Sequence, residues 1–157
     1  MIYDRTIQDV AQAKEIFETK VKNFVALTNA EKTTLERGRV TVNTLNRIEQ
    51  KQAEMAQKLK NYGYFDGDII NKSWSNEVFF NEDLKRLAQN TATLREAFYI
   101  ISSDMKNPEA RFFYEDFNTM ERFLAEIEAL IENMEKSFKR SGAVSANQTI
   151  LPLKGVI

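Results

Sequence analysis

The chain has 157 residues, of which 43% are hydrophobic and 29% are charged, with 22 Lys plus Arg against 23 Asp plus Glu. This length fits one domain with a substantial core, and the composition is that of a folded protein rather than a disordered one. The chain has no Cys, which excludes disulfides and thiolate catalysis, and no His, which leaves acid-base catalysis near neutral pH to a strongly shifted Asp, Glu or Lys.

The patterns of charge and hydropathy also limit the classes of partner that the chain can have. Basic residues alternate with acidic ones, so no basic stripe is present to bind nucleic acid. The first twenty residues lack the apolar stretch of a signal peptide, and no run approaches the roughly 20 apolar residues of a membrane helix. We therefore expect a soluble protein made in the cytoplasm, without nucleic-acid or membrane partners.

Two helices are predicted in the amino-terminal part. Thr6 can cap the first, with Asp9 in its first turn. Its apolar residues recur at three- and four-residue steps and predict one buried stripe, made of Ile7, Val10, Ala13, Phe17, Val21 and Phe24. A capping box of Thr28 and Glu31 opens a second, short helix that ends at Gly38.

Three longer helices follow. The first spans about 43–62 and stops at Gly63. The second starts with Asn81 as its N-cap, carries an apolar stripe to Ile101 and is broken by Asn107-Pro108. The third has a 3.5-residue apolar period from Phe113 to Phe138 and ends at Ser141-Gly142. Between the first two, the aromatic-rich segment 63–80 is predicted to pack against the body. The fold class is therefore all-α, with about five helices in a compact bundle over residues 1–142.

Residues 143–157 contain one charged side chain and no helical period, which predicts an extended carboxyl-terminal arm. Apolar residues crowd its last eight positions, and their exposure to water would be unfavourable by about 25 cal/mol per Å² of apolar surface. We expect the arm to be covered, either by its own body or by a neighbouring subunit. Its predicted docking residues are Thr149, Ile150, Leu151, Leu153, Val156 and Ile157.

Two of the long helices echo each other in sequence. Leu45-Asn46-Arg47-Ile48-Glu49 and Phe117-Asn118-Thr119-Met120-Glu121 lie 72 positions apart, each within an apolar-periodic run. Asn is a poor metal ligand and one carboxylate per unit carries little charge, so a metal site is disfavoured. We interpret each pair as structural, with the Asn side chain bonding the backbone of a neighbouring loop.

The remaining carboxylates also have structural explanations. Glu82-Asp83 and Glu115-Asp116 lie where the first turn of a helix favours acids. Asp66-Gly67-Asp68 lacks the further ligands of a calcium loop and is interpreted as a turn. No catalytic, cofactor-binding or metal-binding residue is therefore predicted, and the chain is not expected to be an enzyme.

The segment 59–68 offers an alternative. Leu59-Lys60-Asn61-Tyr62-Gly63-Tyr64-Phe65-Asp66-Gly67-Asp68 resembles the Leu-Gly-Tyr-x-Asp-Gly stretch of small peptidoglycan-binding three-helix modules, although the second Asp-Gly and the Phe-Gly pair of those modules are absent. Exposed aromatic rings stack well on sugars. A binding site for cell-wall glycan would then consist of Tyr62, Tyr64, Phe65 and Trp74.

A wider resemblance covers roughly residues 3–142. It is carried by Tyr3-Asp4-Arg5-Thr6, Leu27-Thr28, Leu45-Asn46-Arg47-Ile48-Glu49, Trp74, Glu82-Asp83-Leu84, Leu94-Arg95-Glu96-Ala97-Phe98, and the order Tyr114, Asn118, Glu121 and Leu124. In these positions the chain resembles the helical block of small structural proteins encoded in the tail modules of bacteriophages and prophages of Gram-positive hosts. The shared motifs are helix-forming signatures and not catalytic ones.

The resemblance implies a virion structural protein of the tail tip, baseplate or fibre base, present in several copies. It implies no known active site. We expect an adaptor that assembles with other phage tail proteins, as a homo-oligomer and without a cofactor. The alternatives left open are a host cell-wall binding module of the tail and a head-tail connector component.

Overall fold

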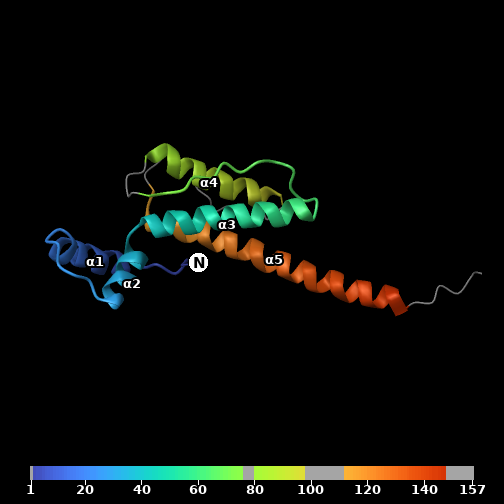
Figure 1. Cartoon of the computed structure of the whole chain (residues 1–157), viewed down its shortest axis with the longest axis horizontal. Coiled ribbons are helices and arrows are strands. Elements are labelled where there is room, and N and C mark those ends of the chain that lie inside the picture. Colours follow the sequence, from blue (N-terminus) through green and yellow to red (C-terminus); the bar gives the residue numbers. More distant parts are fainter. Residues whose placement is uncertain (1, 76–79, 98–111, 148–157) are drawn as a thin grey trace, which may run out of the picture.

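The computed structural model describes residues 2–75, 80–97 and 112–147, the last ten of them by backbone alone. These residues form five α-helices and no strand, which confirms the all-α prediction (Figure 1). The helices are α1 (Ile7–Ile16), α2 (Asn29–Gly38), α3 (Val42–Asn61), α4 (Asn81–Glu96) and α5 (Tyr114–Asn147), with a π-helical turn at Phe17–Val21 that continues α1.

The first two helices start where their capping residues predicted. The Thr6 hydroxyl accepts a hydrogen bond from the Asp9 amide at 3.2 Å, and the Asp9 carboxylate accepts one from the Thr6 amide at 2.7 Å. Thr28 and Glu31 repeat this reciprocal arrangement at the start of α2. Each box satisfies two backbone amides that a helix start otherwise leaves unpaired.

α1 and α2 pack as a hairpin with almost no core. Ala13 is the only fully buried residue of α1, and α2 has none. The helices approach closely at Gly38, where a Cβ atom would overlap the carbonyl oxygen of Asp9. The predicted buried stripe is therefore wrong at its ends, since Ile7 is 71% exposed and Phe24 is 96% exposed. The hairpin is too small to cover its own apolar side chains.

The body consists of α3, α4 and α5, which run in the same direction. Arg47 and Lys51 of α3 pair with Glu121 and Glu128 of α5, so residue numbers rise together along both helices. Along α3 and α4, Arg86 bonds Glu49 and Asn90 bonds Gln52, so residue numbers rise together along these two helices as well.

At the start of α4, Asn81 is the first helical residue rather than the predicted N-cap, which is Phe80. The Asp83 carboxylate accepts a hydrogen bond from the Phe80 amide at 3.1 Å.

Apolar side chains of all three helices meet in one core. Its members are Leu45, Ile48, Met55, Ala56, Leu59, Trp74, Leu84, Leu87, Ala88, Leu94, Phe117, Met120, Leu124, Ile127 and Ile131. The predicted stripes of these three helices supply most of this core. The two echo helices, α3 and α5, pack against each other and against α4.

The segment after α3 returns along that helix before α4 begins. Asp68 bonds Lys60, the Lys72 amide bonds Glu49, and the Trp74 amide bonds Asn46, so the return runs antiparallel to α3. Phe65 and Ile69 are partly buried against the core, and Trp74 is 5% exposed. The prediction that this segment packs on the body is confirmed for residues 63–75.

α5 is longer than the sequence predicted. It continues through Ser141-Gly142 to Asn147, so the predicted stop is wrong and residues 143–147 are helical rather than part of an extended arm. A single Gly lowers helix stability by only about 1 kcal/mol, which is too little to end a helix without a cap. Residues 148–157, including all the predicted docking residues, lie outside the described residues. α5 extends beyond the end of α3, on the side away from the α1–α2 hairpin (Figure 1).

Candidate functional site

Asn118 and Glu121 of α5 bind the amino-terminal segment. The Asn118 side chain exchanges two hydrogen bonds with one residue, accepting the Arg5 amide at 3.2 Å and donating to the Arg5 carbonyl at 2.9 Å. Glu121 is fully buried and accepts the Ile2 amide at 3.2 Å and the Arg5 guanidinium at 2.6 Å. Arg47 of α3 donates to the second Glu121 oxygen at 2.8 Å. We call this arrangement the α5 clasp.

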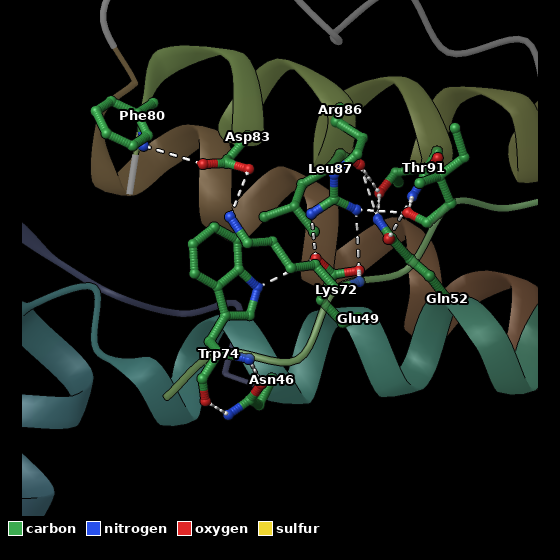
Figure 2. Close-up of polar contacts among 12 residues, drawn as sticks. Asn46, Glu49, Gln52, Lys72, Trp74, Phe80, Asp83, Arg86, Leu87 and Thr91 are labelled. Carbon is green, nitrogen blue, oxygen red and sulfur yellow. Dashed lines mark hydrogen bonds and ion pairs between the residues drawn. The ribbon is translucent and has the colours of Figure 1, made fainter. Parts of the chain in front are cut away.

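Asn46 and Glu49 of α3 bind the return segment in the same way (Figure 2). Asn46 accepts the Trp74 amide at 2.9 Å and donates to the Trp74 carbonyl at 3.0 Å. Glu49 is 3% exposed and accepts the Lys72 amide and the Trp74 indole N–H, each at 3.1 Å. Arg86 of α4 completes the set with two bonds to Glu49. We call this arrangement the α3 clasp.

The two clasps give the sequence echo a common physical meaning. In each, an Asn amide pairs with both backbone groups of one residue, as a neighbouring β-strand would do. The Glu one turn later accepts a backbone amide of the same segment and an Arg from another helix. The structural interpretation of both Asn residues is therefore confirmed. The sequence had not indicated the Arg partners, because nothing in the local pattern of Arg5, Arg47 or Arg86 distinguishes them from surface cations.

A buried amide network extends the α3 clasp into α4. Gln52 donates to the Leu87 carbonyl at 2.7 Å and to the Thr91 hydroxyl at 2.8 Å, and Asn90 donates to Gln52 at 3.2 Å. Asn90 also donates to the Ile70 carbonyl of the return segment at 3.0 Å. These polar side chains are therefore engaged in holding the return segment and two helices together, as buried polar groups generally are.

The buried carboxylates bind cations of the chain itself. Arg5 and Glu121 have side chains only 3% and 0% exposed, and such an ion pair is held by its mutual charge and geometry. Around the helix starts, the Arg37 guanidinium holds the pKa of Asp9 below its usual range. A hydrogen bond from Lys20, assisted by the Thr28 amide, lowers the pKa of Glu31 to about 2. Both groups are thus anionic cap residues near neutral pH.

In residues 2–75, 80–97 and 112–147, no three His, Cys, Asp or Glu side chains lie close enough together to hold a metal ion. Within the same part of the chain, no helix has the length and apolar character needed to cross a bilayer. An open groove of about 390 Å³ lies beside α3, but its lining carboxylate, Glu49, is already bound to Arg86.

The predicted glycan-binding aromatics do not form one exposed platform. Trp74 is buried in the core with its indole N–H bonded to Glu49, so its assignment as a stacking surface is wrong. Phe65 is half-buried against the same core. Tyr62 and Tyr64 are 37% and 48% exposed, and the Tyr62 hydroxyl donates to Glu135 at 2.8 Å. Trp74, the largest aromatic ring of the four, is therefore not accessible for stacking on a sugar.

The tip of the α1–α2 hairpin has an unusual backbone. Phe24 has a φ of 55°, and two hydrogen bonds close the turn, from its amide to the Val21 carbonyl and from the Val25 amide to the Lys20 carbonyl. This is the Schellman pattern, whose left-handed position is normally occupied by Gly. A side chain there costs roughly 1–2 kcal/mol. Phe24 is nevertheless 96% exposed and the adjacent Val25 is 49% exposed. Little packing within the described chain offsets this strain.

The clasps tie chain segments together, while Phe24, the most exposed large hydrophobic residue in the part of the chain that the structure describes, lies on a strained turn at the hairpin tip. The predicted docking residues Thr149 to Ile157 fall outside the described residues, so their placement stays a prediction. No protein-family model matches this sequence, and no curated protein and no solved structure matches it either.

Proposed function

We propose that this chain is a structural adaptor of a bacteriophage tail tip or baseplate and acts through protein-protein assembly. The observation that carries the assembly role is Phe24, a nearly fully exposed aromatic residue on a strained turn. Strained residues are often found where function requires them, and exposed aromatic residues are typical anchors of protein interfaces. The phage context is supported by the sequence resemblance described above.

The use of the polar residues supports the same proposal. Glu49 and Glu121, the two buried carboxylates of the described chain, are each bound to Arg and to backbone amides. A general acid or base would need to reach a substrate. Instead, the clasps fix an amino-terminal segment and a return segment onto long helices, which is how a rigid scaffold is built. A scaffold of this kind suits a protein that positions larger neighbours.

The proposal is tested on virus particles. An antibody against the purified chain is applied to gradient-purified particles of the phage that encodes it, by immunoblot and by immunogold electron microscopy. We expect a fixed copy number per particle and gold label at the distal end of the tail. Label at the head-tail junction would instead assign the chain to the connector. Particles that lack the chain would refute a virion role.

A genetic variant adds the assembly readout. Phage that encode a chain ending at Asn147 retain every described helix but lack the predicted docking residues. We expect these phage to produce incomplete tails, with the truncated chain recovered folded from the lysate. Normal tails would show that residues 148–157 are not needed for assembly.

A further inference from the structure

We infer that the hairpin tip of one copy, formed by Phe24 and Val25, binds residues 150–157 of a neighbouring copy, so that the chain associates head to tail. This inference deepens the assembly role proposed above and names the partner as a second copy of this chain. Three observations carry it: the state of the tip, the composition of residues 150–157, and the distance between the two.

The hairpin tip carries an aromatic side chain against which little of the described chain packs. Phe24 adopts a left-handed conformation that a Gly would adopt without strain, yet its ring is 96% exposed. Val25 beside it is 49% exposed. Nearby cations are already paired, since Lys20 bonds Glu31 and Lys22 bonds Glu18. The tip is therefore an apolar knob whose neighbouring charges are neutralised, which favours an uncharged apolar occupant.

Residues 150–157 have the matching chemistry. The sequence Ile150-Leu151-Pro152-Leu153-Lys154-Gly155-Val156-Ile157 contains five large aliphatic residues and a single charge. Pro152 lacks an amide hydrogen and disfavours helix in the residue before it, so this stretch is poorly suited to extend α5. A short apolar segment of this kind is suited to bind an aromatic anchor through side-chain contacts.

Chain length excludes this contact within one copy. Arg5 is held by Asn118, near the start of α5, and α1 begins two residues later. Asn147 lies roughly 43 Å farther along α5, at about 1.5 Å per residue. The ten residues from 148 to 157 span at most about 35 Å when fully extended. Figure 1 shows the hairpin and the end of α5 at opposite ends of the molecule. The segment therefore reaches a tip only on another copy.

An interface between two different surfaces has a consequence for assembly. Each copy offers one tip and one 150–157 segment, so association is heterologous and leaves a free tip and a free segment at the ends of any open chain of copies. Association therefore continues until a ring closes or until another protein caps an end. A variant that lacks one of the two surfaces still retains the other.

Because each single variant retains one of the two surfaces, the variants can be tested separately and as a mixture. Four proteins are compared by light scattering on a sizing column: the full chain, Phe24→Gly, a chain ending at Asn147, and a control variant. The Gly substitution removes the ring and relieves the strained turn, so loss of association cannot be attributed to misfolding. Ile70→Ser, at a 71% exposed residue of the return segment, is the matched surface control. Far-UV circular dichroism verifies the fold of every variant.

We expect the full chain and Ile70→Ser to form oligomers that the other two variants do not form, with association weakened at least about 30-fold. Mixing Phe24→Gly with the truncated chain should give a complex of one copy each, because the first retains the segment and the second retains the tip. Oligomers of the truncated chain would overturn the inference in favour of contacts between tips or between α5 helices. A monomeric full chain, or a mixture that forms no complex, would also overturn it. If virus particles contain the chain but the isolated chain is monomeric, the proposed function stands and only the head-to-tail contact is rejected.

Discussion

Replacement of Asn46 by Ala tests the α3 clasp directly. The change removes both hydrogen bonds to the Trp74 backbone, at 2.9 and 3.0 Å, and leaves the apolar core untouched. Each neutral hydrogen bond contributes about 1 kcal/mol net, so the loss is about 2 kcal/mol. Ala has a higher helix propensity than Asn, by up to about 0.7 kcal/mol, which offsets part of this loss. We expect a net decrease in the free energy of unfolding of about 1.5 kcal/mol.

The assay uses the single Trp of the chain as the reporter. Trp74 is 5% exposed, so its emission should be blue-shifted in the native protein and shift to the red when the return segment is released. Urea unfolding is followed by Trp74 fluorescence and by far-UV circular dichroism. In Asn46→Ala, we expect the fluorescence transition to move to lower urea than the helical one, because the return segment opens before the helices unfold.

Asn43→Ala is the matched control on the same helix. Asn43 is exposed, and among the described residues its side chain bonds only Glu36, at 2.6 Å, so its replacement should change stability by less than about 0.5 kcal/mol. The difference between the two variants isolates the contribution of the clasp. A difference below about 0.5 kcal/mol, with coincident transitions, would refute the assignment of Asn46 as the residue that holds the return segment.

Three further predictions address the other contacts. Glu121→Gln leaves the buried Arg5 guanidinium without its counter-charge and should cost about 3–5 kcal/mol in urea unfolding, whereas Glu126→Gln at the surface should cost less than about 0.5 kcal/mol. Gly38→Ala places a Cβ against the Asp9 carbonyl and should separate α1 from α2, seen as faster amide hydrogen exchange in the hairpin than in the body. The pKa of Glu31 is lowered from 4.5 to about 2, so its contribution is present above pH 4.5 and is lost as the pH falls toward 2; Glu31→Gln should flatten this part of the acid-unfolding curve.

Local signals in the sequence determined where most helices begin and what faces the core. Thr6 could be identified as a cap with Asp9 in the first turn, and Thr28 with Glu31 as a capping box, because their bonds span only three residues. The apolar periods of α3, α4 and the described part of α5 placed most of the core correctly, since a long helix must bury its apolar stripe, although the first residue of the α5 period, Phe113, is 61% exposed. The structural use of Asn46 and Asn118 was also predictable, because an Asn beside a buried stripe requires a partner.

Tertiary structure decided the identity of those partners and whether side chains such as Trp74 and Phe24 are buried or exposed. Arg5, Arg47 and Arg86 come from other elements, and their proximity to a buried Glu depends on how three parallel helices, the amino-terminal segment and the return segment are arranged. The sequence around Trp74 allowed this residue to be predicted as exposed, and only the tertiary structure shows that it is buried. The exposure of Phe24 has the same origin: periodicity indicates which residues share a face, but a face is buried only where the rest of the molecule is large enough to cover it.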